Sequence, residues 1–320
     1  MTTDSTPSPA PSAPVLSVVI VSYNTREMTL KAIETLYEQA SDIGLQVIVW
    51  DNDSKDGSCD AIAEAFPQVE LHRSTDNLGF AAGNNRAAEG ATGEWLLLLN
   101  SDTEVLPGAI QNLLAFAKAN PQAGIVGGKT LFADGSLNAT SCFNRMTVWS
   151  LLCYSTGLSR VLPNSPFDPE RSVSVSMDEV QQVDIVTGCF FLLKTELWRE
   201  LGGFDLRYFM YAEETDLCLR AAKKGYRPMV TPEATIIHHG GASAISSAVK
   251  QQQSYRGKAT IIRDHFGAVR KQAALAMLWF TALNRHAGHS LLRLAGRPAS
   301  DKAEMWQAVW NRRKEWLKGY

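Results

Sequence analysis

The chain has 320 residues, of which 45% are hydrophobic and 20% charged, the composition of a folded globular protein rather than of a disordered or fibrous one. The formal net charge of −2 hides an asymmetry, because residues 256–320 carry 13 Lys and Arg against 4 Asp and Glu. The first 255 residues carry 18 Lys and Arg against 29 Asp and Glu. We therefore exclude a uniformly basic nucleic-acid-binding protein, and the basic C-terminal segment needs its own explanation.

The sequence predicts a cytoplasmic protein without a membrane span. The first 14 residues, MTTDSTPSPAPSAP, are typical of a disordered lead-in and lack the basic and apolar regions of a secretory signal. The longest uncharged apolar stretch, between Lys271 and Arg285, has 13 residues, whereas a span needs about 20. The five cysteines are scattered without a C-x-x-C pair, which favours a reducing compartment over a disulfide framework or a zinc site.

Apolar runs and helical spacing alternate through the first half of the chain. Strands are predicted at 16–21, 45–50, 69–72 and 95–99, and the helices that follow them at 26–38, 58–66, 80–90 and 107–120. This alternation predicts an α/β fold with a doubly wound, mostly parallel sheet. In such sheets ligands bind beyond the carboxyl ends of the strands.

The second half of the chain is less regular. Residues 134–180 predict loops with one short helix, and the later elements are an apolar run at 183–193 interrupted by Thr187-Gly188, a helix at 216–224 and a strand at 234–237. From about residue 250 the pattern is helical and basic. We expect a lead-in over 1–14, a globular domain over 15–250 with halves at 15–105 and 106–250, and a helical C-terminal segment over 251–320.

Two polar clusters follow the first two predicted strands. Ser22-Tyr23-Asn24 comes after the first strand, and DNDSKDGS, residues 51–58, comes after the second. A carboxylate at this position can accept a hydrogen bond from a base or a sugar. Alternatively, Asp53 or Ser54 caps the next helix, which would account for one acidic residue of the cluster but not for three.

Two further clusters follow in the same half of the chain. DNLGFAAGNN, residues 76–85, is rich in small residues. They would let the backbone approach a ligand at a helix N-terminus. Alternatively, the glycines only allow a tight loop. Asn100-Ser101-Asp102 directly follows the apolar run WLLLL. A carboxylate that ends a buried strand is costly unless it faces a cleft or holds a cation, and oxygen ligands suit Mg²⁺ or Mn²⁺. Asn-Ser-Asp is also common in turns.

Taken in order, these clusters resemble the family 2 glycosyltransferases of the GT-A fold. SVVIVSYN, DNDSKDGS, NLGFAAGNN and LLLLNSD match the nucleotide-sugar half of that family in order and spacing. In the second half, VTGCFFLLK resembles the acceptor-side strand, GGFDLRYFMYAEETDLCLRAAKKGY the segment of the catalytic base, and HHGGAS a late metal-binding turn. The resemblance covers residues 15–245. The narrower resemblance is to bacterial rhamnosyltransferases of cell-wall and O-antigen assembly.

The resemblance implies a site for a nucleoside diphosphate sugar. Asp51 would bind the pyrimidine base, with Ser22, Tyr23 and Asn77 lining its pocket. The remaining residues that the resemblance assigns to the nucleotide sugar are Asn24, Asp53, Gly79, Gly83, Asn84, Asn100, Ser101, Asp102 and Gly188.

The resemblance also implies a divalent cation, Mg²⁺ or Mn²⁺, at Asp102. Asn100 stands where the family's motif has its first Asp, which leaves fewer charges on the cation. His238 would complete the metal site, with His239 as the competitor within the pair. A histidine that is merely packed or hydrogen-bonded is the alternative.

The catalytic base is expected in Glu213-Glu214-Thr215-Asp216, where the family often has Glu-Asp-x-Asp. Glu214 stands at the position of the catalytic Asp, and an inverting transfer needs such a carboxylate within hydrogen-bond reach of the acceptor hydroxyl. Glu213 and Asp216 are the alternatives. Asp216 is the better candidate for a structural role, because the predicted helix begins there.

One other motif is excluded. AGIVGGKT, residues 123–130, has Ala123 where a phosphate-binding P-loop needs glycine, and LFADGS after it signals a hairpin instead of a helix.

The C-terminal segment combines Leu275, Leu278, Trp279, Leu283, Leu291, Leu292 and Leu294 with five arginines and lysines between 270 and 297. Such a helix can lie on an anionic membrane surface, or its apolar face can pack on the catalytic domain or on a second subunit. The resemblance favours the membrane, at the cytoplasmic face of the inner membrane, because family members of this kind extend lipid-linked glycans.

The expected function is therefore inverting transfer of a sugar, L-rhamnose from dTDP-L-rhamnose, to a glycan or lipid-linked glycan acceptor. Galactofuranosyl or glucosyl transfer from a UDP-sugar is the alternative. A non-catalytic subunit that binds sugar nucleotides is a third hypothesis, because Asn100 and Glu214 depart from the family's usual residues. Nucleotidyl transfer is disfavoured because the N-terminal region has no glycine-rich, basic nucleotide-triphosphate loop.

Overall fold

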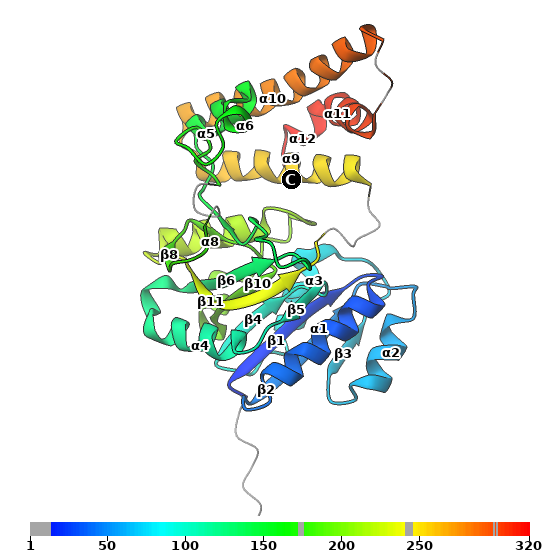
Figure 1. Ribbon diagram of the computed structural model, residues 1–320, viewed down its shortest axis with the longest axis vertical. Coiled ribbons are helices and arrows are strands. Elements are labelled where there is room, and N and C mark those ends of the chain that lie inside the picture. The colour runs from blue at the N-terminus through cyan, green and yellow to red at the C-terminus, as the bar shows by residue number, and fades with distance from the viewer. Residues whose placement is uncertain (1–13, 172–175, 241–245, 297, 299) are drawn as a thin grey trace, which may run out of the picture.

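A mixed sheet with helices on both faces forms the body of the molecule, and further helices form a second layer beside it (Figure 1). The computed structural model describes residues 14–171, 176–240, 246–296, 298 and 300–320. The predicted α/β class is confirmed. Residues 1–13 of the predicted lead-in, and Gly241 to Ser243 of the predicted metal-binding turn, lie outside the described residues.

The main sheet has nine strands in the order β3-β2-β1-β4-β10-β6-β11-β5, with β8 added beside β11, and β7 pairs with β9 in a small second sheet. Strands β3, β2, β1 and β4 are mutually parallel, as are β6 and β11, whereas β10 runs antiparallel between β4 and β6. The strands are β1 (Leu16–Ser22), β2 (Leu45–Asp51), β3 (Glu70–Arg73), β4 (Trp95–Leu99), β5 (Thr103–Val105), β6 (Ile125–Leu131), β7 (Cys142–Phe143), β8 (Gln181–Gln182), β9 (Ile185–Val186), β10 (Phe190–Lys194) and β11 (Met229–His238).

The helices of the first half follow the strands as predicted, but the second half holds more helix than expected. Helix α8 begins three residues before the predicted start at Asp216, and residues 134–180 contain two described helices instead of one. The helices are α1 (Arg26–Gln39), α2 (Ser58–Ala65), α3 (Gly79–Ala88), α4 (Ala109–Ala119), the 3₁₀ turn η1 (Pro121–Ala123), α5 (Val148–Thr156), α6 (Leu158–Val161), α7 (Thr195–Leu201), α8 (Glu213–Lys223), α9 (Ser247–His265), α10 (Ala268–Leu294), α11 (Asp301–Asn311) and α12 (Arg313–Trp316).

The central strands are apolar on both sides because both faces of the sheet are covered. In β1, Val19 belongs to the core on one face, and Val18 and Ile20 belong to the core on the other. All three side chains are fully buried. Side chains of a strand alternate between faces, so a run such as LSVVIV without polar alternation is what a doubly covered strand requires.

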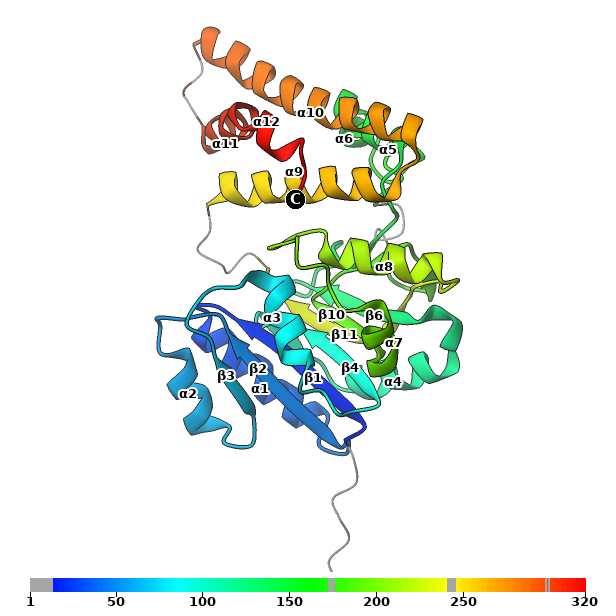
Figure 2. The ribbon, with the colours of Figure 1, turned by 180° about the vertical axis from the view of Figure 1, so that it is seen from behind.

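The C-terminal segment forms the second layer and has a core of its own (Figure 2). Tyr255 on α9 stacks edge-on against Trp306 and Trp316, and Leu278 on α10 joins them together with Leu151 of α5. A helix from the middle of the chain thus belongs to this layer. The predicted division at residue 250 lies inside α9.

Helix α10 packs with one face and leaves other apolar side chains exposed. Leu278 is buried, whereas Leu291 and Leu294 are 65% and 84% exposed. The packing alternative therefore holds for the first part of the predicted apolar stripe only. Among the helices in the described part of the chain, none is both long and apolar enough to cross a bilayer.

The excluded P-loop motif runs from the end of η1 into β6, and the residues after it form a turn. Phe132 donates a backbone hydrogen bond to Ser136, and Leu131 pairs with Leu137, so the chain reverses in a hairpin as predicted. No helix follows β6 here that could present its N-terminus to a phosphate.

Gly79, which opens α3, allows a close approach between the two halves of the sheet domain. Its φ is +82°, and an added Cβ would lie 2.3 Å from the carbonyl oxygen of Phe209 and 2.7 Å from the Phe209 ring. The Phe80 amide donates to that same oxygen at 2.9 Å. The glycine is therefore required for a backbone–backbone contact, and the loop that it holds leads directly into α8.

We predict that Gly79→Ala destabilises the fold by about 3 kcal/mol, the combined cost of a left-handed alanine and of overpacking. Gly135→Ala is the matched control, because Gly135 has φ +80° with nothing within 4 Å, and it should cost about 1 kcal/mol. Urea unfolding of both variants measures the difference. Equal losses would show that the contact with Phe209 adds nothing to the cost.

Candidate active site

A polar cavity of about 330 Å³ lies beyond the carboxyl ends of β1, β4 and β11. We call it the donor cavity. This is the edge of the sheet where a doubly wound fold places its ligand, as the sequence predicted. The sequence-predicted residues that line it are Tyr23, Asn77, Gly79, Asn100, Ser101, Asp102, Gly188, Glu213, Glu214 and His238.

Asp102 and His238 meet in this cavity because of the register of the sheet edge. His238 pairs with Thr103 across the antiparallel β5–β11 ladder, which brings its Nε2 to 3.2 Å from Asp102 Oδ1. The side chains of Asp102 and His238 are 13% and 14% exposed. His239, the competitor, does not line the cavity, and its Nε2 lies 2.7 Å from Glu104 Oε1 instead.

The electrostatics of this pair favour a positive charge between the two side chains. Burial disfavours an ionised Asp102, but the hydrogen bond and the charge of His238 outweigh it and lower the pKa of that carboxyl. Burial also disfavours the imidazolium, but Cys189 and Asp102 outweigh it and raise the pKa of His238 to about 10. Asp102 therefore stabilises a positive charge at this position, either a proton on His238 or a bound cation.

The residues around Asp102 fit a divalent cation that is shared with a ligand. The Oδ1 atom of Asn100 and the Nδ1 atom of His238 are buried without a hydrogen-bond partner, and Asn100 Nδ2 lies 3.3 Å from His238 Nε2. Within the described residues no group of three or more His, Cys, Asp or Glu could hold a metal. One carboxylate, one imidazole and an amide oxygen leave coordination positions for phosphate oxygens of a ligand.

The two glutamates at the start of α8 reach the cavity through a strained turn. Tyr211 and Ala212 both adopt left-handed backbone conformations, with φ of +73° and +79°. Helix α9 packs tightly on this turn, since a Cβ on Gly257 would lie 2.7 Å from the Tyr211 carbonyl oxygen. Non-glycine residues in this region are costly and persist only where the surroundings fix them, often at functional sites.

Glu213 is buried and Glu214 is half-buried. The Oε2 atom of each is fully enclosed and has no hydrogen-bond partner among the described residues. Burial raises the pKa of both groups, and the charge of Glu214 raises the pKa of Glu213 further. Backbone amides of the helix start oppose this effect at Glu214, because they stabilise its ionised form.

Glu214 differs from Glu213 in one further respect: it lines two cavities. Both glutamates line the donor cavity, but only Glu214 also lines a neighbouring cavity of about 390 Å³ between α5, α8 and α9. We call this second space the middle cavity. A carboxylate between two cavities can contact a molecule in each.

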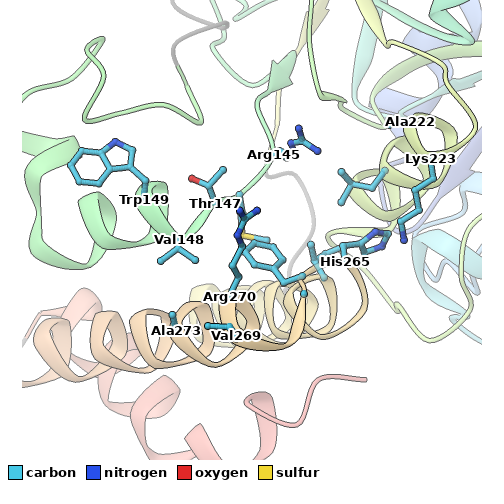
Figure 3. Close-up of a pocket in the computed structure, with 15 residues that line it drawn as sticks. Arg145, Thr147, Val148, Trp149, Ala222, Lys223, His265, Val269, Arg270 and Ala273 are labelled. Atoms are coloured by element: carbon cyan, nitrogen blue, oxygen red, sulfur yellow. The ribbon is translucent and has the colours of Figure 1, made fainter.

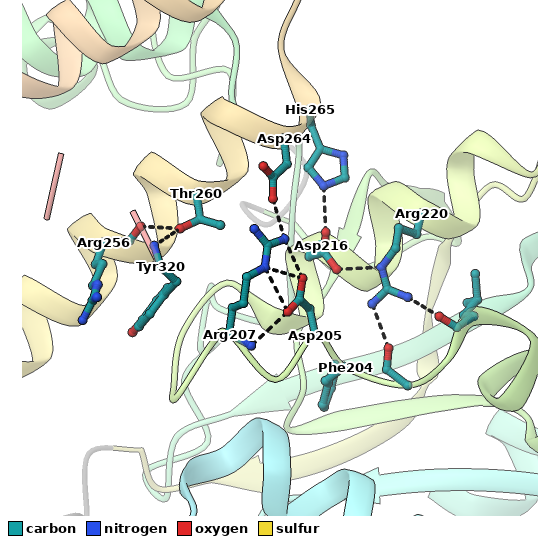
Figure 4. A network of polar contacts seen from close by, with 12 residues as sticks. Phe204, Asp205, Arg207, Asp216, Arg220, Arg256, Thr260, Asp264, His265 and Tyr320 are labelled. Carbon is teal, nitrogen blue, oxygen red and sulfur yellow. Dashed lines mark hydrogen bonds and ion pairs between the residues drawn. The ribbon is translucent and has the colours of Figure 1, made fainter. Parts of the chain in front are cut away.

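Asp216 lies outside all these cavities and has a structural environment (Figure 4). Its Oδ2 accepts a hydrogen bond from Arg220 Nε at 2.6 Å, and its Oδ1 lies 2.7 Å from His265 Nε2 at the end of α9. Burial opposes the charge of Asp216, but His265 and Arg220 outweigh it and lower the pKa of that carboxyl. These contacts agree with the structural role expected for Asp216.

Several residues assigned to the nucleotide sugar lie beside the cavity and tie its loops together. Asn24 donates its backbone N–H to Ser54 Oγ and accepts from the Lys55 amide, so the loops after β1 and β2 are joined. Asp51 is buried, with Oδ1 accepting from the Ser54 amide and Oδ2 without a partner. Asp53 pairs with Lys55. Neither Asp53 nor Ser54 caps α2, whose N-cap is Gly57.

Three others are explained by packing. Ser22 is fully buried, with its hydroxyl 3.2 Å from Thr29 Oγ1. A Cβ on Gly83 would lie 3.0 Å from a Val21 methyl group, so this glycine lets α3 approach β1. Asn84 is buried and donates to the Phe80 carbonyl oxygen within its own helix. None of the three lines the donor cavity.

The structure adds residues that the sequence reasoning missed. Tyr211 and Met210 line the donor cavity from the strained turn, and Lys250 lines it from α9. The other additions are Val21, Thr25, Asn52, Phe80, Thr140, Thr187 and Cys189. Thr187 precedes a predicted site residue and could have been found by that adjacency. The contribution of Lys250 depends on how α9 packs, and no motif signals it.

The sheet topology agrees with the predicted GT-A fold, and comparisons with known proteins support it. The model of the glycosyl transferase family 2 matches residues 17–173, so this part of the chain carries a family 2 glycosyltransferase domain. The fold resembles that of the mannosyltransferase PcManGT from Pyrobaculum calidifontis, which was solved in complex with GDP-Man and Mn²⁺. The TM-score is 0.55 and the sequence identity is 20%, and the match covers 96% of this chain and 84% of that one. The GT-A prediction is confirmed.

Among curated proteins the chain is similar to rhamnosyltransferases. It is 29% identical over 240 residues to the N-acetylglucosaminyl-diphospho-decaprenol L-rhamnosyltransferase of Mycobacterium tuberculosis, covering 70% of this chain and 76% of that protein. It is 26% identical over 252 residues to the rhamnosyltransferase WbbL of Escherichia coli, covering 73% and 88%. The narrower resemblance predicted from the motifs is thereby confirmed.

Proposed function

We propose that the protein transfers L-rhamnose from dTDP-L-rhamnose to a lipid-linked glycan, with inversion at the anomeric carbon. The observation that carries the proposal is the position of Glu214, a half-buried carboxylate that lines both the donor cavity and the middle cavity. The names of the two rhamnosyltransferase relatives support the donor sugar, and one of them names a lipid-linked glycan.

In this mechanism the acceptor hydroxyl enters from the middle cavity and the donor sugar lies in the donor cavity. Glu214 takes the hydroxyl proton while the oxygen attacks the anomeric carbon from the side opposite the diphosphate. The new glycosidic C–O bond forms as the old bond to the diphosphate breaks, and the nucleoside diphosphate leaves with the electron pair. Glu213 lies beside Glu214, and its burial together with the charge of Glu214 raises the pKa of its carboxyl.

A divalent cation fits the residues at Asp102. When bound, such a cation neutralises the charge that develops on the departing diphosphate. Asp102 and His238 would hold it, with Asn100 Oδ1 within the same group of side chains. Tyr23 and Asn77, which line the same cavity, orient the nucleoside part of the donor.

A panel of nucleotide sugars tests the donor, and Asp102→Ala tests the metal. We expect dTDP-L-rhamnose to raise the melting temperature of the wild type in the presence of Mn²⁺, because ligand binding stabilises the folded state by mass action. Asp102→Ala should lose the Mn²⁺-dependent part of this shift and lose transfer. Stronger stabilisation by a UDP-sugar would favour galactofuranosyl or glucosyl transfer. A shift without turnover on lipid-linked acceptors would indicate a non-catalytic binding subunit.

Glutamine variants distinguish the two glutamates. Glu214→Gln keeps the size of the side chain but cannot take a proton, so turnover should fall by about 10²- to 10⁴-fold while donor binding is retained. Glu214→Asp restores the family's usual residue with a shorter reach and should be more active than Glu214→Gln.

Glu213→Gln is the matched control for this series, since it changes the neighbouring buried carboxyl in the same way. It should reduce turnover less than Glu214→Gln does, as measured by initial rates at saturating donor. An inactive Glu213→Gln beside an active Glu214→Gln would assign the base to Glu213 instead.

We also propose that the second layer lies on an anionic membrane surface. Leu291, Leu292 and Leu294 are exposed at the end of α10, next to Arg293. Exposed apolar side chains beside cations are the features by which interfacial helices bind anionic lipids. This would place the enzyme peripherally at the cytoplasmic face of the inner membrane, where lipid-linked acceptors occur.

Co-sedimentation with phosphatidylglycerol vesicles tests the membrane proposal. A Leu291→Glu and Leu294→Glu double variant should bind at least about 10-fold more weakly, because each leucine that enters the interface contributes roughly 1.5–3 kcal/mol. Leu206→Glu is the control, because Leu206 is as exposed as Leu291, both at 65%, and lies in the sheet domain. Unchanged co-sedimentation of the double variant would count against this surface.

A further inference from the structure

Three cavities of different chemistry adjoin one another across the junction of the two layers. The donor cavity and the middle cavity share Glu214. The middle cavity in turn shares Arg145 and Met146 with a third cavity of about 730 Å³ between α5, α8 and the α9–α10 corner. We call this third space the basic cavity. A ligand that extends from Glu214 away from the donor would therefore pass through the middle cavity into the basic cavity.

The middle cavity has the lining expected around a sugar. It mixes the carboxylates of Asp168 and Glu170 with polar and aromatic side chains such as Tyr154 and Tyr211. Carboxylates accept hydrogen bonds from sugar hydroxyls, and aromatic rings cover the apolar faces of sugar rings. Cations are present as well, and these are Arg145, Arg171 and Lys258.

The basic cavity is different, because its charges have a single sign (Figure 3). Arg145, Lys223 and Arg270 line it from three separate elements, and the described lining residues include no Asp or Glu. In the described part of the chain no carboxylate forms an ion pair with Lys223 or Arg270. Arg145 contacts Asp184 Oδ2, with its guanidinium Nε at 3.7 Å in an exposed ion pair and its backbone N–H donating at 2.9 Å. Three cations around an acid-free hollow are suited to a multiply charged anion.

Apart from these cations the walls of the basic cavity are mostly apolar. The apolar lining residues are Met146, Val148, Trp149, Leu219, Ala222, Ile261, Phe266, Val269 and Ala273. Trp149 and Val269 remain 46% and 86% exposed although they are large apolar residues. An apolar chain that is joined to an anionic group would satisfy both parts of this lining.

A buried polar atom gives a second, independent observation. His265 lines the basic cavity and its side chain is 7% exposed, with Nε2 directed to Asp216. Its other ring nitrogen, Nδ1, is buried and has no hydrogen-bond partner. Buried polar atoms without a partner are rare in folded proteins, and a ligand in the cavity would supply the partner.

We propose that the basic cavity binds the phosphate groups and the first part of the apolar chain of the lipid-linked acceptor, while the sugar of that acceptor lies in the middle cavity. This inference rests on the proposed function and deepens it, because it assigns the acceptor to one continuous path. Arg145 stands at the boundary between the two cavities and contacts the phosphate next to the sugar. Lys223 and Arg270 contact it from α8 and α10.

Calorimetric titration with farnesyl diphosphate, which has the phosphates and an apolar chain but no sugar, tests the assignment. The donor cavity is filled with thymidine diphosphate and Mn²⁺ during the titration, so that diphosphate binding there does not contribute. We expect a Lys223→Glu and Arg270→Glu double variant to bind farnesyl diphosphate at least about 10-fold more weakly than the wild type, because two attractive charges become repulsive.

Two further variants make the result specific. Lys118→Glu with Lys302→Glu changes the net charge equally at exposed residues outside the three cavities, and should leave binding unchanged. Ala273→Trp keeps every cation but fills the apolar part of the basic cavity, and should weaken farnesyl diphosphate more than it weakens inorganic pyrophosphate. Melting temperatures close to that of the wild type establish that the variants are folded.

Several outcomes would overturn the assignment. They are the absence of farnesyl diphosphate binding to the wild type, equal binding by the Lys223→Glu and Arg270→Glu variant, and inorganic pyrophosphate binding as tightly as farnesyl diphosphate. Complete competition by phosphatidylglycerol vesicles would assign these cations to the membrane surface instead. Failure of the proposed function is distinguishable, because it would appear as a lack of thymidine diphosphate binding or of transfer while farnesyl diphosphate still binds at Lys223 and Arg270.

Discussion

The buried carboxylate of Asp216 joins the two layers of the molecule, and the geometry of the site depends on it. Arg220, which contacts this carboxylate, also donates to the carbonyl oxygens of Leu201 and Gly203, so α8 is tied to the loop after α7. His265 ties the same carboxylate to the end of α9. Removing one partner from such a buried group leaves an uncompensated charge, which costs several kcal/mol, so the register of α8 against α9 is fixed. The orientation of Glu213 and Glu214, two to three residues earlier in the same helix, is fixed with it.

Much of the sheet domain could be predicted from the sequence because its signals are local. A short apolar run such as WLLLL between turn residues favours a strand that is covered on both faces. The polar residues directly after it mark the carboxyl end where the cavity lies. The insertion of β10 antiparallel between β4 and β6 could not be predicted, since strand order is set by packing between segments far apart in the chain. The sequence pattern predicts the start of α8 three residues too late for a related reason. Tyr211 and Ala212 adopt left-handed conformations that no residue preference signals, and tertiary contacts with Gly257 impose them.

The same distinction between local and tertiary causes runs through the candidate site. The pairing of Asp102 with His238 joins positions more than a hundred residues apart. The motifs predict that both residues lie at strand ends. Only the β5–β11 register shows why His238 and not His239 faces the cavity. Gly83 and Asn84 belong to a motif whose composition suits ligand binding, but the structure accounts for them by the packing of α3 on β1. Sequence motifs therefore indicate which strand ends lie around the candidate site, while the direction of individual side chains depends on the sheet register and the helix packing.

The second layer contributes side chains to the candidate site. Helix α5 supplies Ser150, Leu151 and Tyr154 to the wall of the middle cavity, and α9 supplies Ser254 and Lys258. The same helices share a hydrophobic core with α10, α11 and α12, so the wall has its shape only when the whole layer is folded. In the proposed mechanism an acceptor hydroxyl must be held at hydrogen-bond distance from Glu214, and α5 and α9 of this layer line the middle cavity together with Glu214. The sheet domain thus provides the donor cavity and the proposed base, and the helical layer provides the opposite wall against which an acceptor would be positioned.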